Sequence, residues 1–284
     1  MPELAYLNGE IMPLDQARVP VEDRGYQFGD AAYEFVAAVN GRLFAVEAHL
    51  DRLERTLLAL AFPPLDRNRI REAIFTLHQR AGIARAGIYI QISRGVAPRS
   101  HAFPEKTVPQ VLMTVRPVPP TPPEHLTRGI AAITLADQRW GRCDIKTVQL
   151  LANVMSKQRA LDSGAYDAIF IGPDGTVREG TSSNLFIRSG QRLHTHPLTT
   201  EILPGITRAV LLDICRREGI EVLERRFDRQ EMLAADEVVL TGTVTEVLPV
   251  TRIDGHVIGV GRPGPMAARL RAWLEALAAD PDGP

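Results

Sequence analysis

Lys146 is the residue of this chain whose type and position best suit covalent chemistry. It is the only lysine between Lys106 and Lys157, and it follows Ile145 just before a predicted helix. When a lysine is desolvated, its ammonium form is disfavoured, so its pKa falls and a neutral nucleophilic amine becomes available. The same position also suits a lysine that marks a helix start and keeps its charge in water. The residues alone leave both interpretations open.

Three other segments carry groups that could bind a charged ligand. Glu179 ends a predicted strand beside small polar residues, and its carboxylate could hold the protonated nitrogen of a heteroaromatic ring. Leu203–Arg208 opens a predicted helix, where Gly205 would let an anion reach free backbone N–H groups. Thr241–Thr243 follows an apolar strand and could donate to the same anion. Taken singly, the first segment also suits a polar turn, and the second suits ordinary helix capping.

Helices and strands throughout the chain must position these groups. Two hairpins with Asn-Gly turns open the sequence, over residues 4–12 and 33–46. Apolar spacing then predicts, in chain order, helices over 50–61 and 70–81, strands over 88–94 and 108–115, a helix over 148–161, strands over 168–171 and 176–179, a helix over 206–217, a strand over 238–241 and a helix over 265–277, before a frayed tail at 278–284.

A proline-rich segment divides the chain. Five prolines fall within residues 117–123, which predicts a stiff, extended connector. We therefore expect a small N-terminal domain over residues 1–116, a linker over 117–125 and a larger C-terminal domain over 126–284. Helices and strands alternate in both, so the fold class is α/β (α+β), with the ligand site in the cleft between the domains.

Composition favours a protein that acts on small molecules. Apolar residues make up 45% of the chain, enough for a buried core, and the formal net charge is −1. No basic stripe indicates nucleic acid, no apolar run indicates a membrane span, and no metal site is expected. Only two cysteines are present, and Met1–Tyr6 does not resemble a signal peptide, so we expect a cytoplasmic protein.

Five motifs of the chain are more informative together than singly. They are, in this order, Asp23–Asp30, His49–Leu53, Cys143–Lys146, Glu179–Asn184 and Leu203–Arg208. Together they strongly resemble the fold-type IV pyridoxal-phosphate enzymes, which comprise D-amino-acid aminotransferases, branched-chain aminotransferases and aminodeoxychorismate lyases. The resemblance extends from about Leu7 to the last helix.

The resemblance implies a role for each candidate residue. Lys146 would form the Schiff base with the cofactor and move a proton at the substrate Cα, and Glu179 would pair with the pyridine nitrogen. Arg52 would bind the cofactor phosphate through its planar fork of donors. Other cofactor-binding positions implied are Ser182, Leu203, Ile206, Thr207, Gly242 and Thr243, of which Leu203 would pack on the pyridine face.

One loop resembles the substrate loop of the D-amino-acid aminotransferases. Arg99 and His101 match an arginine and a histidine that bind the substrate α-carboxylate in the neighbouring subunit, together with a tyrosine that matches Tyr33. Without that context, the segment suits a solvated polar loop. The resemblance implies a homodimer with shared sites that transaminates D-alanine, D-glutamate or D-aspartate with 2-oxo acids such as 2-oxoglutarate or pyruvate.

Departures from the family pattern and competing functions are part of this hypothesis. Thr181 stands where serine is common, Gly141 should widen the substrate pocket, and Gly242 should cost one phosphate donor. A branched-chain L-aminotransferase or an aminodeoxychorismate lyase would keep Lys146 and Glu179 without needing the arginine–histidine pair. From another class, a non-catalytic pyridoxal-phosphate-binding protein would not need to keep both residues.

Overall fold

The computed structural model describes residues 3–280 and contains two compact units. The N-terminal unit holds the chain up to Pro119, together with Ile145–Gln149 and the end of the chain from Ala278. The C-terminal unit holds Pro120–Asp144 and Leu150–Leu277. The first change of unit falls between Pro119 and Pro120, within the proline-rich segment. None of the helices described is long and apolar enough to cross a membrane.

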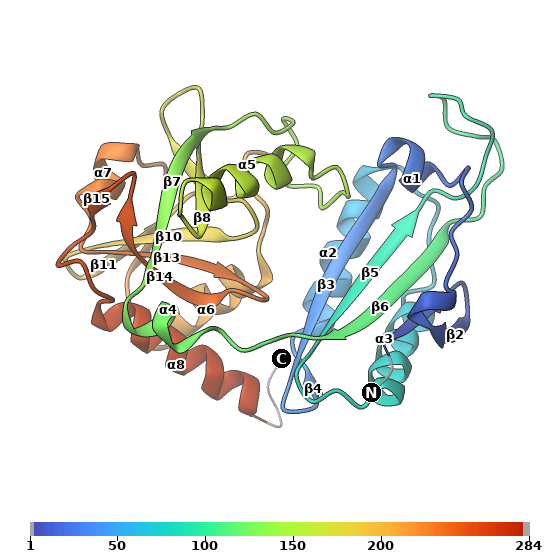
Figure 1. Ribbon diagram of the computed structural model, residues 1–284, viewed down its shortest axis with the longest axis horizontal. Helices are drawn as coiled ribbons and strands as arrows, with labels where there is room; N and C mark the ends of the chain where they lie inside the picture. Colours follow the sequence, from blue (N-terminus) through green and yellow to red (C-terminus); the bar gives the residue numbers. More distant parts are fainter. Residues whose placement is uncertain (1–2, 281–284) are drawn as a thin grey trace. The chain divides into compact units, whose positions relative to one another are not determined.

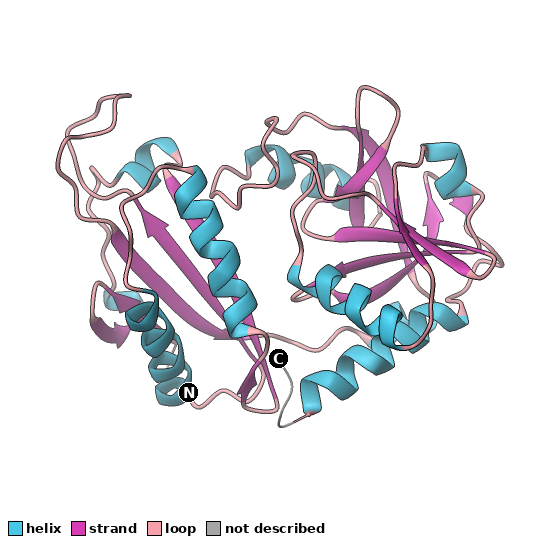
Figure 2. Cartoon of the chain, turned by 180° about the vertical axis from the view of Figure 1, so that it is seen from behind, coloured by secondary structure: helices cyan, strands magenta, loops and turns pink. Residues whose placement is uncertain are grey.

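The N-terminal unit is an antiparallel sheet with two long helices, α2 (Val46–Ala59) and α3 (Arg67–Ala81), on one face (Figure 1, Figure 2). A short helix, α1 (Arg24–Phe28), precedes the third strand. The six strands lie in the order β2-β1-β6-β5-β3-β4 and comprise β1 (Leu4–Leu7), β2 (Glu10–Pro13), β3 (Ala31–Val39), β4 (Arg42–Leu43), β5 (Ala86–Ser93) and β6 (Gln110–Pro117).

The local sequence explains how α2 and α3 are placed. Leu50, Leu53 and Leu57 recur at helical spacing and are buried in the core shared with the sheet. In α3, the Asp66 side chain caps the first turn, and Gly82 ends the helix in the left-handed region at φ 63°. The predicted helical patterns are confirmed, although α2 begins four residues earlier than its first predicted leucine.

The C-terminal unit is built on a mixed nine-stranded sheet (Figure 1). Helix α5 (Leu151–Asp162) contacts β7 and β8, and α6 (Ile206–Arg217) contacts β12 and β13. The strand order is β12-β11-β10-β13-β14-β7-β8-β9, with β15 beside β14; the bounds are β7 (Ile130–Ala136), β8 (Asp167–Ile171), β9 (Val177–Gly180), β10 (Asn184–Ser189), β11 (Arg192–Thr195), β12 (Val222–Glu224), β13 (Glu237–Gly242), β14 (Glu246–Ile253) and β15 (His256–Val257). The remaining helices that begin in this unit are α4 (Pro123–Thr127), α7 (Arg229–Leu233) and α8 (Pro265–Ala279), whereas η1 (Leu14–Gln16) belongs to the N-terminal unit.

The α/β fold class is confirmed, and several boundaries need correction. The second hairpin ends at Leu43, because Ala45 adopts the left-handed conformation at φ 53° and starts α2 at Val46. The proline-rich segment is not wholly extended, since α4 begins with Pro123, whose fixed φ suits a first helical turn. The expected fraying does not begin at Ala278: α8 continues to Ala279, and Arg42 binds its carbonyl group. Residues 281–284 lie outside those described.

Candidate active site

Lys146 is fixed by pairing with a strand of the N-terminal unit. The Tyr33 N–H on β3 donates to the Lys146 carbonyl at 3.0 Å, and the Val148 N–H donates to the Ala31 carbonyl at 3.2 Å. Helix α5 begins only at Leu151, so the predicted helix start at Val148 is wrong. Lys146 therefore lies in a short non-helical segment held against β3, which excludes the interpretation of a lysine that simply opens a helix.

The side chain of Lys146 lies against an aromatic ring. Its Nζ is 4.1 Å from the centre of the Tyr33 ring, and its backbone N–H donates to Thr56 Oγ1 at 3.4 Å. Both partners belong to the N-terminal unit. An ammonium group is attracted to the face of such a ring, so the contact orients the amine. The structure thus brings together two of the residues that the sequence singled out, Lys146 and Tyr33.

Arg52 is held by a buried carboxylate that the sequence analysis did not identify. Glu34 on β3 accepts hydrogen bonds from Arg52 Nε at 2.7 Å and from Arg52 Nη2 at 2.9 Å, and His49 Nδ1 lies 2.8 Å from the same carboxylate. Burial raises the pKa of Glu34, but Arg52 and His49 outweigh that effect and hold it well below its usual range. The Arg52 guanidinium is therefore fixed in one orientation.

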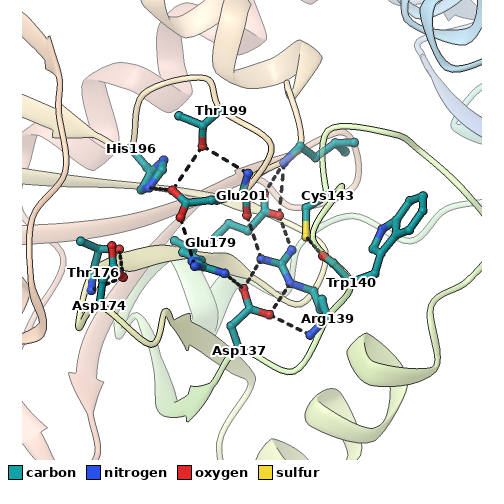
Figure 3. Close-up of polar contacts among 12 residues, drawn as sticks. Asp137, Arg139, Trp140, Cys143, Asp174, Thr176, Glu179, His196, Thr199 and Glu201 are labelled. Atoms are coloured by element: carbon teal, nitrogen blue, oxygen red, sulfur yellow. Dashed lines mark hydrogen bonds and ion pairs between the residues drawn. The ribbon is translucent and has the colours of Figure 1, made fainter. Parts of the chain in front are cut away.

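Glu179 is the central carboxylate of the C-terminal unit (Figure 3). It is buried at the end of β9, where Asn184 Nδ2 donates to it at 3.0 Å and the Leu203 N–H donates at 3.0 and 3.2 Å. Arg139 Nη1 forms a further short ion pair with it. Burial raises the pKa of Glu179, and the positive charge of Arg139 opposes that shift without reversing it.

Behind Glu179, charged side chains alternate in sign (Figure 3). Arg139 directs Nε and Nη2 to Asp137 at 3.0 and 2.9 Å. Arg178 donates to the same Asp137 at 2.8 Å and to Glu201 at 3.1 Å. Arg139 binds Asp137 through Nε and Nη2 and binds Glu179 through Nη1 alone. Its positive charge is therefore shared, and it neutralises the Glu179 carboxylate only in part. Sequence analysis assigned no role to any of these supporting residues.

The start of α6 has no side-chain cap. Gly205 is the residue before the helix, and among the described residues no side chain caps the first turn, in which Ile206 and Thr207 are buried. A Cβ at Gly205 would lie 1.9 Å from Asn184 Oδ1, so glycine is required for this close approach. Free N–H groups at the positive end of a helix favour an anion such as phosphate.

The remaining candidates of the C-terminal unit lie in turns. Ser182 is exposed between β9 and β10, and Thr243 is half-buried after β13. A Cβ at Gly242 would lie 3.3 Å from the Ser182 carbonyl, so these two segments are neighbours. Within the part of the chain described, the buried hydroxyl of Thr241 has no hydrogen-bond partner. These features suit a polar ligand beside Gly242.

Arg99 and His101 lie on an exposed loop between β5 and β6. Within one chain, their side chains contact Phe28 at the end of α1. Large apolar side chains are exposed near them in the sequence, with Phe103 at 59% and Val108 at 76% of full exposure. A loop that presents a guanidinium, an imidazole and apolar groups to the outside is suited to binding another molecule.

The chain matches a known protein family. The Amino-transferase class IV family matches it over residues 31–253. The chain belongs to this family and is an aminotransferase, which confirms the resemblance carried by the five motifs.

Individual relatives refine the likeness. The chain is 41% identical to a D-alanine aminotransferase of Bacillus licheniformis over 94% of each chain. It is 37% identical to a D-alanine aminotransferase of Staphylococcus aureus, over 96% of this chain and 97% of the relative. Among solved structures, the branched-chain amino acid aminotransferase of Escherichia coli superposes with a TM-score of 0.91 at 26% identity, over 98% of this chain and 95% of that one.

Proposed function

We propose that this aminotransferase moves amino groups between D-amino acids and 2-oxo acids with pyridoxal 5'-phosphate as its cofactor. D-alanine, D-glutamate and D-aspartate are the proposed donors, and 2-oxoglutarate and pyruvate are the proposed acceptors. Relatives named for D-alanine share 41% and 37% of their residues with the chain, against 26% for the branched-chain enzyme. That difference supports D-amino acids over branched-chain L-amino acids.

The observation that carries the proposal is the incomplete charge compensation of Glu179. Its carboxylate accepts hydrogen bonds from Arg139, Asn184 and the Leu203 N–H, yet burial still raises its pKa. The N–H of a protonated pyridine ring would bring a further positive charge to this carboxylate. That charge would offset the burial that raises the pKa of Glu179. When bound, the cofactor draws electrons from the substrate Cα and carries the amino group, and Glu179 keeps the ring nitrogen protonated for this purpose.

Lys146 is the proposed catalytic base. Its amine would hold the cofactor in the resting enzyme, and the same amine would move the proton at the substrate Cα during the reaction. Tyr33, 4.1 Å from Nζ, orients this amine. The backbone of Lys146 pairs with β3, and this pairing fixes the position of the base without help from a helix. The lowered pKa predicted for Lys146 stays a prediction.

Arg52 and the start of α6 are the proposed phosphate ligands. Glu34 holds the Arg52 guanidinium in place, and the backbone N–H groups of Ile206 and Thr207 add directed donors. Thr243 would add a hydroxyl, while Gly242 supplies none. Leu203 would pack on the pyridine face, and Ser182 belongs to the same polar surroundings.

Arg99, His101 and Tyr33 are the proposed ligands of the substrate α-carboxylate. We propose that the first two enter the site of a second subunit, so that the active enzyme is a homodimer. The exposed apolar side chains of one chain support this assembly. Besides the loop, α5 exposes Leu151 and Met155 at 72% and 64%, a stripe at helical spacing that a partner would cover.

A cytoplasmic location is also proposed. Both cysteines, Cys143 and Cys215, are free and buried, which suits a reducing compartment. Nothing in this proposal requires a metal, nucleic acid or membrane.

The proposed substrate is tested by the half-reaction of the purified enzyme. D-alanine should convert the lysine-bound cofactor to its aminated form, followed by absorbance, at a rate that exceeds that with L-leucine by orders of magnitude. Lys146→Ala should retain cofactor through the phosphate contacts but fail to convert it. Faster conversion with L-leucine would support a branched-chain enzyme instead, and no conversion with either would contradict the assignment.

A further inference from the structure

The side chains of Arg99 and His101 share one aromatic partner, the ring of Phe28. The Arg99 Cζ lies 4.8 Å from the centre of this ring, and the His101 ring lies edge-on at 5.7 Å and 67°. A third side chain, Arg24, approaches the same ring to 4.8 Å. Both proposed carboxylate ligands are therefore held by one residue of α1, at the end of the sheet where the loop emerges (Figure 1).

Arg24 ties the backbone of the loop at the same place. This buried arginine donates to the Ser100 carbonyl at 2.6 Å and to the His101 carbonyl at 3.5 Å. Its Nε binds Asp30 at 2.8 Å. Hydrogen bonds from a charged donor are stronger than those between neutral groups, so these contacts restrict the loop between its two ligand residues.

A second buried arginine holds the far side of the loop. Arg94 donates to the same Asp30 at 2.8 Å, and its Cζ lies 3.7 Å from the centre of the Phe103 ring. Its other donors bind the carbonyl groups of Leu60 and Ala61 at the end of α2. The loop is exposed, yet it is anchored on both sides to the sheet and to α2.

The Phe28 ring holds the centre of the Arg99 guanidinium at 4.8 Å. Where a guanidinium packs its flat face on an aromatic ring, its N–H donors lie around the edge of that plane. In that arrangement the edge is available for the two oxygens of a carboxylate. An arginine fixed before the substrate arrives also loses less conformational entropy on binding.

We infer that Phe28 and Arg24 are positioning residues for recognition of the substrate α-carboxylate, and that they act through Arg99 and His101. The inference rests on the proposed role of Arg99 and His101. The affinity of the enzyme for D-alanine and its preference for D-amino acids would then depend on the Phe28 ring and on the buried Arg24, neither of which binds the carboxylate itself.

The experiment is a double-mutant cycle on the complete enzyme. The half-saturation concentration of D-alanine is measured in the half-reaction for the wild type, Phe28→Leu, Arg99→Ala and the double variant. Phe28→Leu should raise it about fivefold to tenfold, as expected for loss of a cation–π contact, with a smaller effect on the limiting rate. In the Arg99→Ala background, Phe28→Leu should add little.

Three controls separate positioning from structure. Phe75→Leu removes a ring that Arg71 approaches to 4.9 Å on α3, and it should behave as wild type. Phe28→Tyr keeps the ring and should restore the half-saturation concentration. D-alaninamide, which has no carboxylate, should react equally well with the wild type and Phe28→Leu. If Phe28→Leu lowers thermal stability, Arg24→Lys provides a second test and should show the same pattern.

The outcomes are distinct. If Arg99→Ala leaves the half-saturation concentration unchanged, the proposed carboxylate site fails, and this inference fails with it. If Arg99→Ala raises that concentration but Phe28→Leu does not, only the positioning role is overturned. Full additivity of the two substitutions, or an equal loss with D-alaninamide, would also overturn it.

Discussion

Two buried glutamates of this enzyme, Glu34 on β3 and Glu179 on β9, each pair with an arginine, yet their pKa values shift in opposite directions. Arg52 gives two donors to Glu34, and His49 adds a third contact. Arg139 instead directs two donors to Asp137 and only one to Glu179. The pKa of Glu34 is therefore lowered, whereas burial keeps that of Glu179 raised.

The difference separates a carboxylate that its basic partners compensate fully from one that they compensate only in part. Glu34 has its charge compensated within the protein and serves to hold Arg52. Glu179 is buried without full compensation, and the like charge of Asp137 also raises its pKa. An uncompensated buried charge is costly to a protein. In the role proposed for Glu179, the protonated ring of the cofactor would supply the missing positive charge.

The largest expected effect comes from Glu179→Gln. A neutral amide cannot keep the ring nitrogen protonated, so single-turnover conversion of D-alanine should slow by about 10²- to 10³-fold. The cofactor should still bind through its phosphate. The cofactor-free variant should be at least as stable as the wild type near neutral pH, because a poorly compensated charge has been removed. An unchanged single-turnover rate would show that Glu179 is not the ring partner.

Glu34→Gln should have the opposite effect. Removing the carboxylate leaves Arg52 buried without its counter-charge, which should lower the free energy of unfolding by about 3 kcal/mol. Urea unfolding of the cofactor-free protein measures this loss. Glu47→Gln is a matched control, because Glu47 also has two basic partners, Arg67 and Arg71, but is exposed to water. Equal stability of the Glu34 and Glu47 variants would contradict the comparison.

A smaller effect concerns the pH dependence of stability. The pKa of Glu179 is raised from its ordinary 4.5, so the folded cofactor-free protein binds this proton more tightly than the unfolded chain does. Its contribution to stability is present below pH 4.5 and is lost as the pH rises through the raised pKa. As the pH rises from 4.5 through the raised pKa of Glu179, the wild type should therefore lose stability relative to Glu179→Gln. Identical pH profiles for the two proteins would refute this.

Glu34 should show the reverse pH dependence. Its pKa is lowered from 4.5, so its contribution is present above that pH and is lost as the pH falls toward the lowered pKa. The Glu34→Gln variant should lack this loss in acid. Together, the two titrations distinguish the carboxylates without reference to catalysis.

Sequence alone predicted much of the local structure. Helix α6 has the predicted bounds, Ile206–Arg217, because its apolar spacing and its flanking glycines are local signals. The first hairpin is also confirmed, with Asn8 and Gly9 at positive φ. The family is confirmed too, since linked motifs carry more information than any one of them.

Long-range partners could not be predicted in the same way. Lys146 pairs with β3, more than a hundred residues earlier, and no periodicity encodes that contact. Asp137 follows β7 and meets Arg178 on β9 because both strands flank β8. Glu34 gave a weak signal, as a charged residue within an otherwise apolar strand pattern, but only the fold shows that Arg52 and His49 compensate it.

The most direct test of this account is a comparison of two cofactors. The dissociation constant of the cofactor-free enzyme is measured for pyridoxal phosphate and for an analogue in which a C–H group replaces the ring nitrogen. The wild type and Glu34→Gln should both prefer pyridoxal phosphate by at least about tenfold, the equivalent of one charge-assisted hydrogen bond. Glu179→Gln should lose that preference. Equal binding of the two cofactors by the wild type would contradict the claim that Glu179 is completed by the ring cation.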